Sequence, residues 1–186
     1  MEMPMISKQR GTYQRKLKPV LSELAVTLKD LPCVNYQKFW IIRVGDGLNF
    51  VNSNFPFWGS KRGKHGNIKS LVKKINVGDI LCFITPKPYG GKVIGMATYT
   101  GFYDRIDEPL LSINTKSNED QNWVGGGLWD IQIHYSKLYI TEKENILVSI
   151  QHCASILEYE KYKPNVKGDL YELHKKCMLN STPKIF

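Results

Sequence analysis

The chain has 186 residues, 42% of them hydrophobic, which suits one domain with a real core and does not suit two full domains. Its formal net charge is +9, which favours a polyanionic partner, with nucleic acid first among the candidates. No apolar run approaches the ~18 residues that cross a bilayer, and residues 1–18 lack the apolar centre of a signal peptide. We therefore expect an intracellular protein, cytoplasmic or nuclear, without membrane contact.

Residues 1–18 are polar and basic, and they predict a flexible arm. Residues 19–31 carry leucine and alanine at three- and four-residue spacing behind a proline, which predicts a short helix. Residues 38–44 are rich in aromatic and β-branched side chains and predict a strand.

Residues 45–64 form a long predicted loop that contains Phe50, Phe55, Phe57 and Trp58. Disordered segments carry few aromatic residues, so this loop is expected to pack and to line a site. The adjoining residues 61–74 contain six lysines or arginines and no acid, with Asn67 as the predicted cap of a short helix. Crowding like charges costs self-repulsion that an anionic ligand would relieve, although a solvated surface is the alternative.

Residues 80–84 and 92–102 predict two strands joined as a hairpin, with Gly95 at a bulge or a close approach. Residues 104–121 are locally acidic and predict a surface excursion, and residues 128–140 alternate as expected of a further strand.

The C-terminal part predicts two helices. Thr141 and Glu144 have the spacing of a capping box at the start of a helix that extends to residue 162, and a second helix is expected at 168–179. The predicted organisation is a flexible arm (1–18), a single domain (19–180) with its core at 38–140 and C-terminal helices at 141–180, and a frayed tail (181–186).

No pattern of catalytic or metal-binding residues is evident. The four cysteines are scattered without a Cys-x-x-Cys pair, and the four histidines fall in different predicted elements. Cys82 lies in an apolar run and is expected to be a buried, inert thiol. We therefore predict no enzyme activity, no cofactor and no metal site.

The tryptophans indicate base stacking. Trp58 and Trp123 fall in predicted loops, whereas Trp40 and Trp129 fall in predicted strands and are expected in the core. Stacking of a base on an aromatic ring is worth roughly 1–3 kcal/mol, and a methyl group on a sandwiched base fills space between two rings. For each loop tryptophan, a place in a pocket and a place in the core are about equally expected.

The order of these features resembles the PUA-like superfamily, in particular its YTH and EVE branches. The resemblance covers about Phe39–Ile140. The shared features are the first strand Phe-Trp-Ile-Ile-Arg-Val, the loop ending in Trp58-Gly-Ser60, the strand in Val77-Gly-Asp-Ile-Leu-Cys-Phe-Ile, the segment Lys92-Val-Ile-Gly-Met-Ala-Thr-Tyr, and Trp123 ahead of Gly126-Gly-Leu-Trp-Asp-Ile. The resemblance implies an α+β fold, a single small mixed β-barrel with flanking helices. It also implies an aromatic cage for a modified base, N6-methyladenosine in RNA for YTH domains and modified DNA bases for EVE domains.

The resemblance assigns roles to five residues. Trp58 matches the first cage tryptophan, with Ser60 just beyond it, and Trp123 lies where a later cage aromatic falls. Asp46 and Asn49 lie where family members contact the base edge. The chain departs from the YTH pattern because Gly59 separates the tryptophan from the small polar residue. The third cage wall stays open between Val124 and Leu128.

The leading hypothesis is a non-enzymatic reader that holds a modified base between Trp58 and Trp123. The predicted phosphate-binding residues are Lys61, Arg62, Lys64, Lys69, Lys73 and Lys74. The second hypothesis is an interaction protein without a working base pocket, whose basic face binds a protein or generic nucleic acid. The third is an enzyme acting on nucleic acid, which a cleft shared by Asp46, His65 and Asp79 would favour. The modification, the choice between RNA and DNA, and the oligomeric state stay open.

Overall fold

The computed structural model describes residues 37–63, 67–105, 116–125, 129–141, 147–149 and 155–186. The chain divides into two units, residues 1–36 and 37–186, and all of the described residues belong to the second unit. The predicted arm at 1–18 and the predicted helix at 19–31 lie outside the described residues. No helix in the described part of the chain is long and apolar enough to span a membrane.

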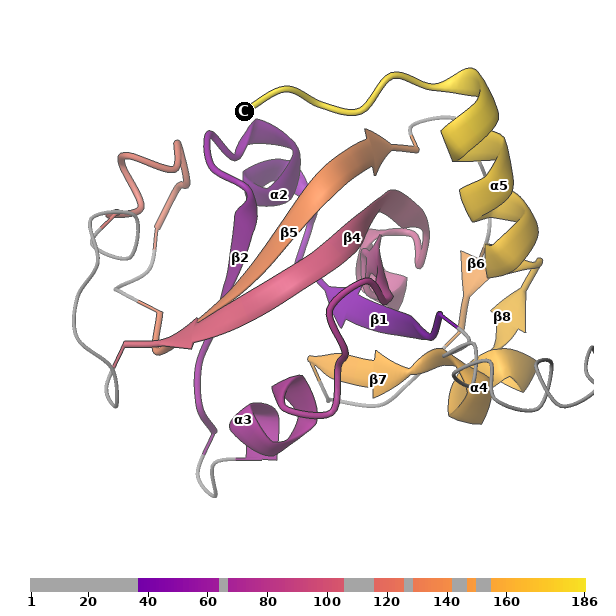
Figure 1. Ribbon diagram of the computed structural model, residues 1–186, viewed down its shortest axis with the longest axis horizontal. Coiled ribbons are helices and arrows are strands. Elements are labelled where there is room, and N and C mark those ends of the chain that lie inside the picture. The colour runs from indigo at the N-terminus through magenta and orange to yellow at the C-terminus, as the bar shows by residue number, and fades with distance from the viewer. Residues whose placement is uncertain (1–36, 64–66, 106–115, 126–128, 142–146, 150–154) are drawn as a thin grey trace, which may run out of the picture. The chain divides into compact units, whose positions relative to one another are not determined.

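Six strands form one mixed sheet in the order β2-β5-β4-β3-β1-β7 (Figure 1). Their bounds are β1 (Phe39–Arg43), β2 (Phe57–Ser60), β3 (Ile80–Ile84), β4 (Val93–Asp104), β5 (Ile131–Ile140) and β7 (Ile156–Glu158). Strands β1 and β3 are parallel, and the other neighbours are antiparallel. The predicted α+β class is confirmed. Within the described ranges the sheet has two edges, β2 and β7.

Both faces of the central strands are buried. On β1, Phe39 and Ile41 belong to one hydrophobic cluster, and Trp40 and Ile42 belong to another, because successive side chains of a strand point to opposite faces. Helix α5 (Leu170–Asn180) adds residues to the first cluster. Helices α2 (Leu48–Asn52) and α3 (Asn67–Val72) add residues to the second. This burial explains the continuous apolar runs that predicted β1 and β3.

Several local predictions are confirmed. Strands β3 and β4 form an antiparallel hairpin. A Cβ built on Gly95 would lie 2.7 Å from the Phe50 ring, so the predicted close approach is present and excludes a larger residue. Helix α5 begins after Asp169, whose carboxylate accepts a hydrogen bond from the Tyr171 backbone N–H at 2.8 Å. The Cys82 thiol is buried in the first cluster, and burial raises its pKa.

The interpretation of residues 45–64 as one long loop is wrong, because the segment contains α2 and β2. Gly47 precedes α2 with φ +90°, a left-handed conformation that glycine adopts without strain. Strand β2 pairs antiparallel with β5, and Trp58 lies opposite Ile133. Trp58 is therefore a strand residue on the edge of the sheet.

The interpretation of residues 141–162 as one helix is also wrong in its described parts. Ile156 and Leu157 are adjacent and both buried, which a strand achieves by using both of its faces. The remaining short elements are β6 (Leu147–Val148), α4 (Tyr159–Tyr162), β8 (Val166–Lys167), and the 3-10 helices η1 (Lys87–Tyr89) and η3 (Lys163–Asn165). Strands β6 and β8 form a separate antiparallel pair.

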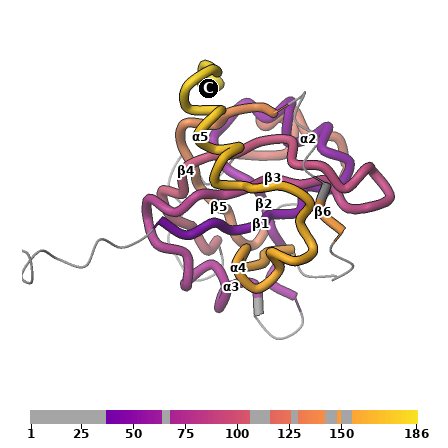
Figure 2. Tube along the Cα trace, turned by 90° about the vertical axis from the view of Figure 1, so that its right-hand side faces the viewer, coloured from indigo at the N-terminus to yellow at the C-terminus, as the bar shows by residue number. Residues whose placement is uncertain are grey.

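Residues 181–186, for which the sequence predicts a frayed tail, extend from α5 toward α2 (Figure 1). The Lys184 ammonium donates to the backbone carbonyls of Val51 at 2.8 Å and Ser53 at 2.7 Å, at the end of α2. Burial lowers the pKa of Lys184. In the view of Figure 2, α2 and α5 lie above the strands and α3 and α4 lie below them. By packing, α4 and α5 contribute to the first cluster, and α2 and α3 contribute to the second.

Candidate functional site

A cavity of about 470 Å³ lies where β1, β2, α2 and α3 meet, a volume within the usual range of ligand pockets. Its lining residues are Arg43, Val44, Gly45, Asp46, Asn49, Trp58, Gly59, Ser60, Lys61, Gly63, Ile68, Trp129 and Ser155. Five residues that the sequence singles out for a base or a phosphate therefore line one cavity: Asp46, Asn49, Trp58, Ser60 and Lys61.

The prediction that Trp129 is a core strand residue is wrong, because Trp129 lines this cavity. It precedes β5, it is half-buried, and its ring lies directly against the backbone of Gly59. A Cβ on Gly59 would lie 2.2 Å from Trp129 Cγ, so only glycine allows this contact. The glycine between Trp58 and Ser60, which departs from the YTH pattern, thus makes room for a second tryptophan of the cavity.

Trp123 lies behind these two rings and does not line the cavity. It is 6% exposed, and its indole N–H donates to Ser53 Oγ at 2.8 Å. Its ring centroid lies 5.0 Å from that of Trp58 and 6.2 Å from that of Trp129. Trp123 therefore supports both of the cavity's tryptophans from within the protein. From the sequence it is instead predicted to form a wall of the cage.

The polar residues of α2 are engaged by neighbouring backbone groups. Asn49 donates through Nδ2 to the Val124 carbonyl at 3.2 Å and accepts the Val124 N–H on Oδ1 at 2.9 Å. Asp46, which precedes the N-cap residue Gly47, accepts the N–H of Leu48 at 3.1 Å. Val124, a candidate for the third cage wall, is 88% exposed, and Leu128, the other candidate, lies outside the described residues. Asn49 thus fixes the segment that carries Trp123.

Two cations line the cavity. Arg43 ends β1, and the Lys61 ammonium lies 5.9 Å from the centroid of the Trp129 ring. Arg43 is absent from the sequence-based set of phosphate ligands, because a single arginine at the end of an apolar strand gives no signal of a role in a site.

Two of the predicted phosphate-binding residues are paired with a buried carboxylate. Asp104, at the end of β4, has no solvent exposure. It accepts hydrogen bonds from Arg62 Nη2 and pairs with Lys69 Nζ at 2.8 Å. The Arg62 backbone N–H also donates to Asp130 Oδ2 at 2.9 Å. These contacts hold the segment that carries Lys61 against the sheet and reduce the charge that Arg62 and Lys69 offer to a ligand.

The remaining predicted phosphate-binding residues are Lys64, Lys73 and Lys74. Lys73 and Lys74 follow α3 and are exposed, and Lys64 lies outside the described residues. The described members of the set thus have three settings: Lys61 lines the cavity, Arg62 and Lys69 pair with Asp104, and Lys73 and Lys74 are exposed after α3.

The cleft that would favour an enzyme is not formed by the residues described. Asp79 is buried and accepts hydrogen bonds from Trp40 Nε1 at 2.9 Å and from the Asn76 N–H at 3.0 Å. It therefore lies apart from Asp46, which lines the cavity, and His65 is outside the described residues. Among the described side chains no group of three His, Cys, Asp or Glu could hold a metal ion.

Comparisons with known proteins give one structural similarity. No protein-family model matches the chain, and no curated protein matches it. The crystal structure of the Pho92 YTH domain in complex with m6A is similar at 18% sequence identity and a TM-score of 0.30. The similarity covers 57% of this chain and 64% of that chain, less than two thirds of its length. That domain belongs to the YTH branch named from the sequence. At this TM-score, the function of the present chain has to be argued from its own residues.

Proposed function

We propose that this protein is a non-enzymatic nucleic-acid reader that holds a modified base in the cavity beside Trp58 and Trp129. The observation that carries the proposal is the cavity itself, about 470 Å³ in volume, which combines two tryptophans with the cations Arg43 and Lys61. Stacking on the rings would favour a flat, uncharged base, and the cations would favour the phosphate attached to it. The modified base is N6-methyladenine in RNA or a methylated base in DNA.

The polar lining would read the edge of the base. Asp46 and Ser60 line the cavity, and a carboxylate can accept from an exocyclic N–H group of a base. Asn49 contacts the same cavity, but both atoms of its amide already bond to Val124. We assign Asn49 to positioning, together with Trp123, which packs behind Trp58.

The phosphate of the modified nucleotide would lie on Lys61 and Arg43 in the cavity, and the exposed Lys73 and Lys74 beyond it would contact only phosphates of neighbouring nucleotides. Arg62 and Lys69 would contribute less, because Asp104 pairs with both. A partner of this kind agrees with the net charge of +9.

The test is binding of short RNA and DNA oligonucleotides, plain, N6-methyladenine-bearing or 5-methylcytosine-bearing, measured by fluorescence anisotropy at two salt concentrations. The wild-type protein should prefer one modified oligonucleotide over its plain counterpart. Trp58→Ala and Trp129→Ala should each lose about 1–3 kcal/mol of binding, about 5- to 150-fold, and should lose the preference as well. Tyr89→Ala, which removes an exposed ring on η1, serves as the matched control.

Equal weakening for modified and plain oligonucleotides in both tryptophan variants would contradict the cage. Salt-sensitive binding without any preference would instead favour the second hypothesis, an interaction protein that uses exposed lysines such as Lys73 and Lys74. The contact between the Trp58 and Trp123 rings counts against that hypothesis, which expects two mutually distant rings.

A further inference from the structure

A second, smaller cavity of about 170 Å³ lies between α3, β7 and α4. Its lining includes Trp40, Leu71, Lys74, Glu158, Lys161 and Tyr162. The base cavity shares none of these residues. The second cavity combines an aromatic ring and two ammonium groups, the types of side chain that contact a base and a phosphate, with the carboxylate of Glu158.

The two cavities are neighbours along the same strand pair. Arg43 and Ser155 line the first cavity, and the Arg43 N–H donates to the Ser155 carbonyl at 3.0 Å. Trp40 and Glu158, which line the second, lie opposite each other in the pairing of β1 with β7. Val44, which also lines the first cavity, points to the same face as Trp40, and the two residues are four apart, about 13 Å at the rise of a strand.

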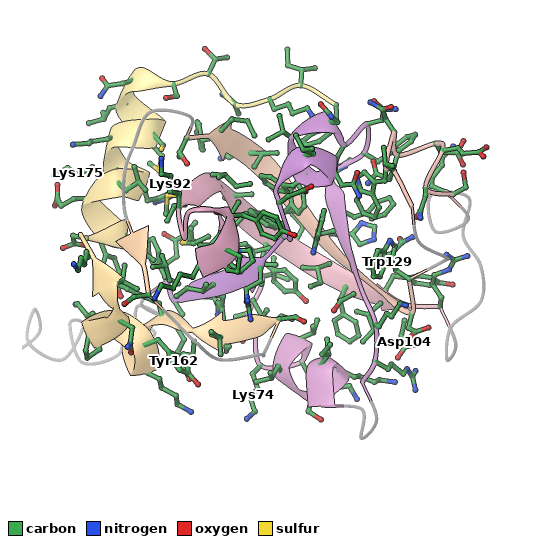
Figure 3. All side chains as sticks on the ribbon, turned by 180° about the vertical axis from the view of Figure 1, so that it is seen from behind. Lys74, Lys92, Asp104, Trp129, Tyr162 and Lys175 are labelled. Atoms are coloured by element: carbon green, nitrogen blue, oxygen red, sulfur yellow. The ribbon has the colours of Figure 1, made fainter. Side chains whose placement is uncertain are left out.

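Helix α3 crosses this path and contributes to both cavities. Ile68 lines the first cavity and Leu71 lines the second, and these residues are three positions, about 4.5 Å, apart along the helix axis. Figure 3 shows Lys74 between Tyr162 and Asp104 in the view. A strand of nucleic acid that leaves the first cavity toward β7 therefore reaches the second.

The charges favour a nucleic-acid strand that leaves the first cavity toward β7 over one that leaves it toward Asp104. Lys74 and Lys161 line the second cavity, and both are exposed. Lys161 lies 3.7 Å from Glu158, a contact between a strongly exposed ammonium and a partly exposed carboxylate that is worth little in water. On the other side, Arg62 and Lys69 are held by the buried Asp104.

We propose that the second cavity is the subsite for the nucleotide next to the modified one. Its phosphate lies on Lys74 and Lys161, and its base lies against Tyr162. The strand thus runs along β1 and β7 and crosses α3. This inference rests on the proposed function, because the first cavity must hold a base for the second to hold the adjacent nucleotide.

The test uses the 5′-monophosphate of the modified nucleotide that the anisotropy assay selects, N6-methyladenosine or 5-methyl-2′-deoxycytidine, and two dinucleotides that extend it by one nucleotide on the 5′ or the 3′ side. For the wild-type protein, one dinucleotide should bind at least tenfold more tightly than the monophosphate, and the other should bind like the monophosphate. Lys74→Ala/Lys161→Ala should abolish this gain while the affinity for the monophosphate stays within twofold. The slope of log K against log salt for the favoured dinucleotide should become flatter by about 0.7, one phosphate contact on a single strand.

The matched control is Lys92→Ala/Lys175→Ala. It removes the same charge from exposed positions that lie away from Lys74 in Figure 3, and it should keep the gain. Equal gains from both dinucleotides, a gain that survives loss of Lys74 and Lys161, or an equal loss in the control would each overturn the inference. Failure of the proposed function is seen separately, as equal binding of the methylated and plain monophosphates.

Discussion

The buried carboxylate of Asp104 gives the sharpest prediction on stability. Asp104 is fully buried, whereas the side chains of its partners Arg62 and Lys69 are 27% and 22% exposed. Asp104→Asn keeps one carbonyl oxygen but turns an uncharged N–H₂ group toward two cations. Removing one member of a buried ion pair costs about 3–5 kcal/mol. Because both cations keep some contact with water, we expect the lower end, about 3 kcal/mol.

Urea or guanidinium unfolding followed by tryptophan fluorescence measures this loss. A domain of about 150 residues loses about 2–4 °C in Tm per kcal/mol, so the thermal midpoint should fall by about 6–12 °C. Glu172→Gln, which neutralises an exposed acid on α5, should change the free energy of unfolding by less than about 0.5 kcal/mol. A loss below 1 kcal/mol for Asp104→Asn would refute the reasoning, because the ion pairs would then contribute no more than exposed ones.

Three further predictions concern the contact of Gly59 with Trp129, the half-buried His134 and the C-terminal residues 181–186. Gly59→Ala should displace the ring of Trp129 and weaken binding of the modified oligonucleotide at least tenfold in the anisotropy assay, and unchanged binding would exclude this contact from the site. Burial lowers the pKa of His134 in the folded protein. As the pH falls, the imidazole ring is therefore protonated in the unfolded chain at a higher pH than in the folded protein. The stability that the neutral ring provides is complete above pH 6.5 and declines as the pH falls from there, by up to about 1.4 kcal/mol per pH unit. His134→Gln should therefore show a flatter decline than the wild type between pH 7 and 5.5 in urea unfolding, and parallel curves would contradict this sign. Lys184→Met should lose about 1–3 kcal/mol of unfolding free energy, since two backbone carbonyls at the end of α2 lose a charged donor; an unchanged midpoint would show that the C-terminal segment does not stabilise α2.

The central strands could be predicted from the sequence because their burial is expressed locally. Ile80–Ile84 is apolar at every position, since both faces of β3 are covered. The cap of α5 is equally local, because Asp169 bonds two residues along the chain. The helix prediction for residues 141–162 is wrong because the contact that decides the structure there is not local. The apolar spacing of these residues fits a helix, and only the pairing of β7 with β1 decides that Ile156–Glu158 is a strand.

The residues of the candidate site also divide into those that the sequence indicates and those that only the fold brings together. Trp58, Ser60 and Lys61 can be grouped from the sequence alone, because they are neighbours on one strand and the loop that follows it. That Trp129 lines the cavity and Trp123 supports it is evident only in the folded protein, since the arrangement depends on a glycine about seventy residues before Trp129. The folded structure also determines which lysine and arginine side chains are available to bind a phosphate.

Arg62 and Asp104 are 42 residues apart in sequence, and no local pattern records that they meet. A run of lysines and arginines establishes that positive charge is present in a segment. Whether that charge reaches a ligand depends on the carboxylates that other strands bring beside it, and electrostatic pairing follows distance in space and not along the chain.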